Sequence, residues 1–177
     1  MLAQLVKLFR PSSEQQEAYS LYAALVQQAR EPRLYTTLGV PDTLDGRFEL
    51  IVLHLFLIFE RLQPDIGSGT FRQYLAEAFF DDMDRSLREM GVGDTGIGRR
   101  VQKMSEAFYG RMKNYAEALG NTAVLEDALR RNLYGTLSED ADPPLSVAAK
   151  YVFESLSLLK NQPIEEIHAA NPHFPAL

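Results

Sequence analysis

The sequence contains no cysteine. A disulfide, a thiolate nucleophile and a cysteine-ligated metal are therefore excluded for this chain. The absence agrees with a reducing compartment. Histidine is also scarce, with three in 177 residues, which leaves few candidates for acid–base chemistry at neutral pH.

A long hydrophobic run is missing as well. The most apolar segment, Leu50 to Phe59, has ten residues and includes His54, whereas a spanning helix needs about 20. Met1 to Phe9 has neither a basic region ahead of its apolar residues nor a small-residue cleavage pattern after them. We therefore expect a cytoplasmic protein, at most associated with the inner face of the cytoplasmic membrane.

Positive charge is in the minority. The 18 basic and 24 acidic residues give a formal charge of −6, which argues against nucleic acid as the main partner. The chain is 46% hydrophobic and 24% charged, an ordinary globular composition that supports one sizeable core.

Alternating strand patterns are absent, and helical periodicity dominates. The spacing of apolar residues predicts an all-α, single-domain bundle of six to seven helices. A short amphipathic segment is expected at 1–12, the helical domain at 13–165 and an irregular C-terminal tail at 166–177. The expected helices cover residues 14–30, 45–62, 70–90, 97–119, 122–134 and 144–160, with a short segment around 34–38.

Several local signals refine these helices. Asp45 is a candidate N-cap for the apolar helix that follows it, and Gly91 is a candidate left-handed C-cap. Asp81 precedes Arg85 by one turn, and Asp84 precedes Arg88 in the same way, the favourable order for ion pairs on a helix.

Gly91 to Gly96 matches the spacing G-x-G-x-x-G of dinucleotide-binding loops. That fingerprint requires a preceding strand and a βαβ unit, whereas the residues before Gly91 are helical in pattern. We interpret the motif as a turn between two helices, with Asp94 or Thr95 as N-cap.

Three further motifs have ordinary structural interpretations. The single E-x-x-H at Glu165 to His168 supplies too few ligands for a di-iron site, so no metal or cofactor is predicted. Asp81 to Asp84 lacks the glycine and bidentate glutamate of a calcium loop and is typical of a solvated or ion-paired helix face. His54, within the most apolar helix, is expected to be a hydrogen-bonded core residue, and no catalytic residue is predicted.

One segment is locally basic. Glu106 is the single acidic residue between Thr95 and Tyr115. Arginine stems can lie on the core while their guanidinium groups reach acids or a partner. The candidate partner-binding residues are Arg99, Arg100, Lys103, Phe108, Tyr109 and Arg111. The alternative is a solvated face with structural ion pairs.

Leu2, Leu5, Val6 and Phe9 form an apolar stripe at helical spacing, with Lys7 and Arg10 beside it. Such a segment can rest on an anionic membrane surface, so these four residues are candidates for membrane contact. Packing of this short segment on the bundle is the alternative.

Two blocks of sequence carry a resemblance to a known family. The first runs from Leu38 to Glu49 and continues through Leu53 to Leu57 and Arg61-Leu62; the second runs from Asp82 to Asp94 and continues through Arg100-Val101 and Lys103-Met104 to Ala107–Arg111. Both resemble the ubiquinol–cytochrome c chaperone family, in its bacterial form, over residues 20–135.

The resemblance implies an all-helical, non-enzymatic chaperone that binds cytochrome b during assembly of the bc1 complex. Mitochondrial members also act with a small co-chaperone and with the ribosome, so both are possible partners here. Two alternatives stay open at this point. One is a helical adaptor for another membrane or ribosomal partner, and the other is an enzyme or cofactor binder with a polar site around His54.

Overall fold

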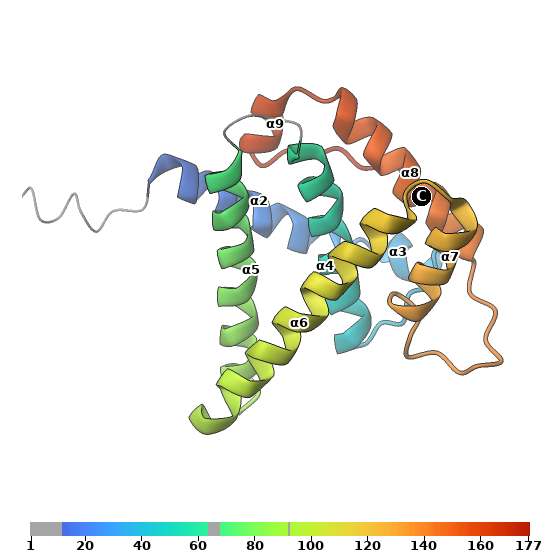
Figure 1. Ribbon diagram of the computed structural model, residues 1–177, viewed down its shortest axis with the longest axis horizontal. Helices are drawn as coiled ribbons and strands as arrows, with labels where there is room; N and C mark the ends of the chain where they lie inside the picture. Colours follow the sequence, from blue (N-terminus) through green and yellow to red (C-terminus); the bar gives the residue numbers. More distant parts are fainter. Residues whose placement is uncertain (1–11, 64–67, 92) are drawn as a thin grey trace, which may run out of the picture.

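The computed structural model describes residues 12–63, 68–91 and 93–177. Within these ranges the regular secondary structure is all helix, with no strand, which confirms the predicted all-α class (Figure 1). The helices are α2 Ser13–Gln28, α3 Pro32–Thr36, α4 Leu44–Leu62, α5 Gly69–Glu89, α6 Asp94–Ala118, α7 Thr122–Arg131, α8 Leu145–Asn161 and α9 Ile164–His168.

Helix α4 is the central element. Its residues from Leu50 to Ile58 are nearly all buried, as expected for a helix with little polar face. It packs against α2, α6 and α8, and in Figure 1 it lies between α5 and α7. Within the described part of the chain, no helix has the length and apolar character required to cross a membrane.

The start of α4 differs from the prediction. Thr43, not Asp45, is the N-cap, and its side-chain oxygen accepts a hydrogen bond from the Gly46 amide at 3.1 Å. Asp45 lies in the first helical turn, where its negative charge interacts favourably with the positive end of the helix dipole. A Cβ atom at Gly46 would lie 2.0 Å from the Pro41 carbonyl oxygen, so the loop can approach the helix this closely only at a glycine.

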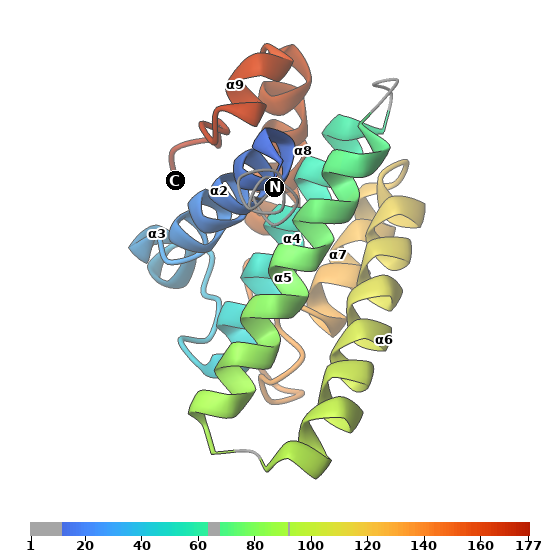
Figure 2. The same ribbon diagram turned by 90° about the vertical axis from the view of Figure 1, so that its left-hand side faces the viewer.

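Helices α5 and α6 form a long antiparallel pair joined by a tight turn (Figure 2). Gly91 follows the end of α5 with a φ of +77°, which confirms the predicted left-handed C-cap. Helix α6 begins at Asp94 with Gly93 as its N-cap, so the predicted cap at Asp94 or Thr95 is wrong. Gly91 and Gly93 of the motif therefore lie in the connection between two helices, and Gly96 lies in the first turn of α6.

The acidic cluster at the start of the second sequence block connects α5 to α2. Asp84 pairs with Arg88 at 2.7 Å, as predicted. Asp81 instead accepts a hydrogen bond from the Tyr19 hydroxyl at 2.5 Å, and Asp82 accepts one from the Tyr22 hydroxyl at 2.7 Å. These tyrosines lie on α2, so the two carboxylates hold that helix against α5.

His54 is fully buried in α4 and has partners for both ring nitrogens. Nδ1 lies 2.7 Å from the Leu50 carbonyl oxygen, and Nε2 lies 2.8 Å from the Tyr151 hydroxyl. A carbonyl oxygen only accepts, so Nδ1 carries the proton and Nε2 accepts from Tyr151. Burial lowers the pKa of His54 to about 4, and the prediction of a hydrogen-bonded core histidine is confirmed.

The C-terminal segment is more ordered than the sequence suggested. Helix α9, Ile164–His168, extends past the boundary expected at residue 165. The residues after it contain no helix, yet they pack on the bundle, because the Phe174 ring contacts His54 at 4.9 Å between centroids. Gln162 secures this segment, since its amide donates to the Asn171 carbonyl at 2.6 Å and its oxygen accepts from the His173 amide at 3.0 Å.

Candidate functional site

A groove of about 1250 Å³ opens where five parts of the fold meet. Its walls come from the α2–α3 junction, the start of α4, the end of α5, the middle of α6 and the turn after α7. This volume exceeds that of most small-molecule pockets, which run to about 1,000 Å³. The groove is therefore large enough for a segment of polypeptide.

The groove has an apolar side in which methionine is prominent. Three of the five methionines of the chain lie there. Two of its apolar residues face solvent strongly, since Leu44 is 64% and Met90 is 52% exposed. Methionine is flexible and polarizable, which suits surfaces that receive apolar partners of varied shape. The main apolar residues are Leu44, Phe48, Met83, Leu87, Met90 and Met104.

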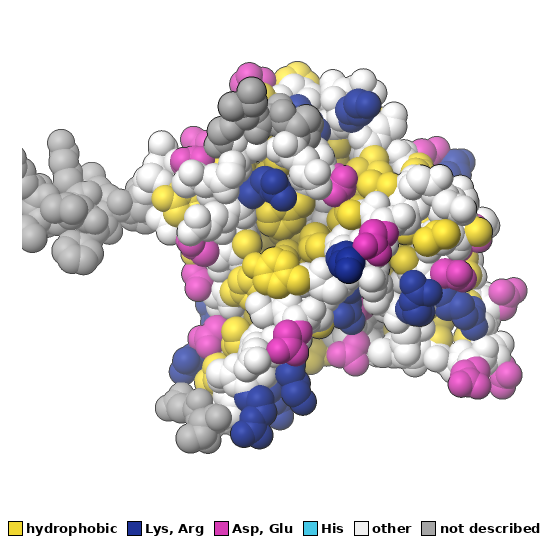
Figure 3. Space-filling model, viewed as in Figure 1, with side chains coloured by type: hydrophobic (Ala, Val, Ile, Leu, Met, Phe, Trp, Pro, Cys, Tyr) yellow, Lys and Arg dark blue, Asp and Glu magenta, His cyan; other side chains and the backbone are white. Residues whose placement is uncertain are grey.

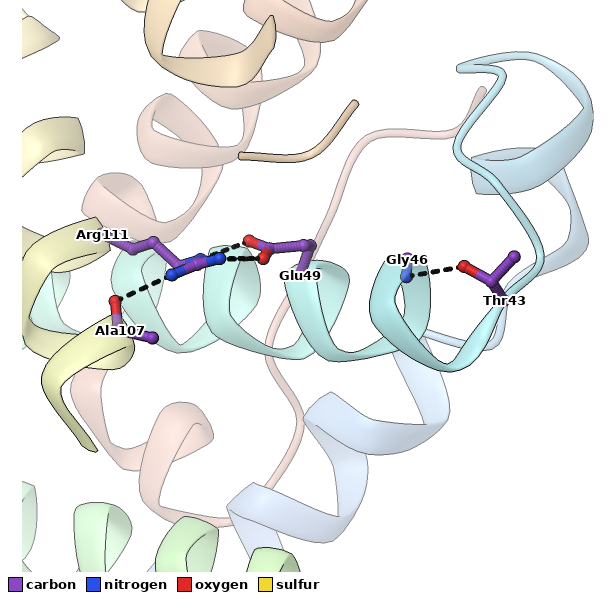
Figure 4. Close-up of polar contacts among 5 residues, drawn as sticks. All are labelled: Thr43, Gly46, Glu49, Ala107 and Arg111. Carbon is purple, nitrogen blue, oxygen red and sulfur yellow. Dashed lines mark hydrogen bonds and ion pairs between the residues drawn. The ribbon is translucent and has the colours of Figure 1, made fainter. Parts of the chain in front are cut away.

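Glu49 and Arg111 form an ion pair in the wall of the groove (Figure 4). Arg111 Nε donates to Glu49 Oε2 at 2.6 Å, and Arg111 Nη2 donates to Oε1. Arg111 Nη1 also donates to the Ala107 carbonyl at 3.2 Å, and its guanidinium carbon lies 5.6 Å from the centroid of the Phe48 ring. Burial raises the pKa of the Glu49 carboxyl, and the hydrogen bonds from Arg111 oppose that shift.

The structure separates the six predicted partner-binding residues into two groups. Arg100 and Lys103 are exposed and line the groove. Arg99 is exposed on the same helix but does not line it. Arg111 lines the groove, yet its guanidinium is occupied by Glu49, which is the acid-binding role that the sequence allowed.

Phe108 and Tyr109 lie elsewhere. Phe108 is 2% exposed and stacks on Phe79 at 4.9 Å between centroids, so it is a core residue and leaves the set of contact candidates. Tyr109 is 60% exposed and contacts Phe80 and Phe108 at the edge of the core.

Figure 3 shows hydrophobic side chains gathered in a hollow between α4, α5 and α6, and basic side chains gathered toward the α5–α6 turn.

The sequence analysis considered two other groups of residues, for membrane contact and for metal binding. The candidates for membrane contact, Leu2, Leu5, Val6 and Phe9, lie outside the described residues. His168 of the E-x-x-H motif stacks on Phe71 at 4.1 Å between ring centroids and lies 3.4 Å from Glu17. Its described neighbours are thus an aromatic ring and one carboxylate, so it joins α9 to α2 and α5.

Other groove residues had no signal in the sequence. Arg30 and Arg131 are ordinary charged residues near the ends of α2 and α7, and Leu44 and Met90 resemble the end residues of an apolar helix stripe. These four are far apart in the sequence. Only the packing of five elements brings them to one groove.

Comparison with known proteins decides the family. The model of the family described as ubiquinol-cytochrome C chaperone matches residues 36–174, well over half of the chain. The chain belongs to the ubiquinol–cytochrome c chaperone family. The matched range contains α4 to α9, so most of the groove of this family member lies within it, and only the wall from α2 and the start of α3 precedes it.

Similar proteins come from bacteria and vertebrates. The crystal structure of the Cbp3 homolog from Brucella abortus has a TM-score of 0.81 and 31% identity, and the match covers 99% of this chain and 97% of that one. Ubiquinol-cytochrome-c reductase complex assembly factor 1 of Xenopus laevis is 24% identical over 80% of this chain and 72% of its own length. The human protein of that name is 22% identical over 85% of this chain and 50% of its own length. The chain thus spans about half the length of its human relative.

Proposed function

We propose that this protein is an assembly chaperone for ubiquinol–cytochrome c reductase, the bc1 complex, and that its client is cytochrome b. The observation that carries the proposal is the family match over residues 36–174. Relatives whose names describe assembly factors for this complex support it. Cytochrome b as client is what the sequence resemblance implies.

The chemistry of the groove favours binding over catalysis. Three of its four carboxylates have structural partners, because Glu49 pairs with Arg111, Asp42 with Arg47 and Asp82 with Tyr22. A general base needs a carboxylate or imidazole within reach of a substrate proton, and these side chains are already engaged. The exposed apolar residues beside them are suited to a hydrophobic protein segment that awaits its final partners.

Affinity capture tests the proposal. A tagged copy is purified after mild crosslinking from native cells that are making the bc1 complex, and mass spectrometry identifies what accompanies it. Cytochrome b should be strongly enriched over other abundant membrane proteins. Robust capture of other partners without cytochrome b would contradict the proposal and favour a helical adaptor for another membrane or ribosomal partner.

Matched variants connect the capture to the groove. Leu44→Ser with Met90→Ser removes two exposed apolar side chains of the groove and should lower the recovery of cytochrome b by about tenfold, a change of about 1.4 kcal/mol. Val124→Ser with Leu158→Ser removes side chains that are 44% and 42% exposed outside the groove. That pair should leave recovery near the wild-type level.

A further inference from the structure

The charge of the groove is opposite in sign to that of the whole chain. Six Arg or Lys residues and four Asp or Glu residues line it, whereas the chain has a formal charge of −6. A concave site with apolar walls concentrates the field of its charges. The groove is thus a locally positive site on an acidic protein.

Part of this charge is neutralised internally. Arg47 pairs with Asp42 at 2.7 Å, and Arg111 pairs with Glu49. These two pairs use equal numbers of cations and carboxylates. They therefore leave the positive excess of the groove unchanged.

Four cations and two carboxylates, Asp45 and Asp82, then remain in the groove, which gives an excess of two positive charges. Among the residues that the structure describes, no ion pair is found for Arg30, Arg100, Lys103 or Arg131. All four are exposed. Arg100 and Lys103 are three residues apart on α6 and project from the same helix face, so one partner segment can meet both.

The cations of α6 lie beside apolar groove residues. Met104 follows Lys103 directly and lines the groove with it, and Met90 lies at the end of the neighbouring α5. A segment held here would bury hydrocarbon against the methionines while its polar atoms remain near the cations. Burying those cations without a counter-charge would be costly, whereas carboxylates would form charge-assisted hydrogen bonds with them.

We propose that the groove selects a client segment that is apolar along one side and carries carboxylates where it meets Arg100 and Lys103. This inference rests on the proposed function, and it specifies the chemistry of the client segment. A flat anionic membrane surface has the same charge, but it cannot enter a concave site. A polypeptide segment can present both the apolar side chains and the acidic groups inside the groove.

Two synthetic peptides test this selectivity with the purified full chain. Both are fluorescein-labelled, helix-forming peptides with leucines along one side; one has a pair of glutamates at one end, and the other has glutamines there. Fluorescence anisotropy gives the Kd of each. The glutamate peptide should bind about tenfold more tightly, equivalent to about 1.4 kcal/mol, and added salt should reduce the difference. Equal Kd values for the two peptides would overturn the inference.

Charge reversal locates the effect. Arg100→Glu with Lys103→Glu should abolish or invert the preference for the glutamate peptide. Arg85→Glu with Lys113→Glu makes the same change in net charge at exposed residues outside the groove and should retain the preference. Circular dichroism checks that both variants keep their helical content. A preference that survives reversal of Arg100 and Lys103 would contradict the assignment to this groove.

The experiment separates this inference from the proposed function. Capture of cytochrome b together with equal peptide affinities would overturn the charge selectivity and leave the chaperone role in place. A clear peptide preference without capture of cytochrome b would support the charge selectivity and contradict the proposed chaperone role. Binding to phosphatidylserine vesicles over phosphatidylcholine vesicles that is lost on reversal of Arg100 and Lys103, with no peptide preference, would assign the cations to a lipid surface and overturn the inference.

Discussion

Replacing Arg111 with methionine is expected to lower the free energy of unfolding by about 3–5 kcal/mol. The substitution leaves Glu49, whose side chain is 7% exposed, buried without its cation. Chemical denaturation monitored by circular dichroism measures the loss. The cost arises from the uncompensated carboxylate, because methionine retains most of the apolar stem of the Arg111 side chain.

Two controls separate this cause from a general effect of mutating α6. Lys113→Met breaks a pair with Glu117 that is 3.8 Å long and in which the side chains are 73% and 64% exposed. Such surface pairs contribute about 0–1 kcal/mol, so little change is expected. Glu49→Leu combined with Arg111→Met should recover most of the stability, since it removes both buried charges. A double variant as unstable as Arg111→Met alone would contradict this account.

Acidification from pH 7 to pH 5 is expected to remove about 2 kcal/mol of stability through His54 alone. The pKa of His54 is about 4 in the folded protein, against an ordinary value of 6.5. Between these values the unfolded chain binds a proton that the folded protein does not. Each pH unit within that window therefore costs about 1.4 kcal/mol, and stability falls as pH falls.

The variant His54→Gln tests this directly, because glutamine can hydrogen-bond but does not titrate. The variant is expected to be less stable than wild type at pH 7, since it loses the ring contacts with Tyr151 and Phe174. Between pH 7 and pH 5, however, the variant should lose about 2 kcal/mol less of its free energy of unfolding than the wild type loses. Parallel pH profiles for the two proteins would show that His54 is not the titrating group.

Much of the fold follows from local pattern. The apolar run from Leu50 to Phe59 marks the central helix, and Gly91 marks the end of α5, because a left-handed residue there is most easily a glycine. The choice between Thr43 and Asp45 as N-cap was beyond local pattern, since both are good caps. The close approach of the Pro41 carbonyl to Gly46 accompanies the choice of Thr43, and that contact depends on the folded loop.

The site was predictable only in part. The shortage of acids around Arg100 and Lys103 identified two groove residues from sequence alone. Phe108 belongs to the apolar stripe of its helix, and that stripe correctly indicates its burial in the core. The nearby basic residues had suggested a contact residue instead. The other two groove cations without an ion pair among the described residues, Arg30 and Arg131, could not be associated with Arg100 and Lys103. The residue pattern within one helix does not indicate which distant helix ends it meets in the fold.

Site-specific photo-crosslinking in cells that are making the bc1 complex would show directly whether cytochrome b occupies the groove. A photoreactive amino acid is placed at Leu44 or Met90 in the groove, and at Val124 or Leu158 outside it, all of them exposed apolar positions. Cytochrome b adducts are expected from the two groove positions, with few or none from the other two. Equal adducts from all four positions, or cytochrome b adducts only from the positions outside the groove, would contradict this expectation.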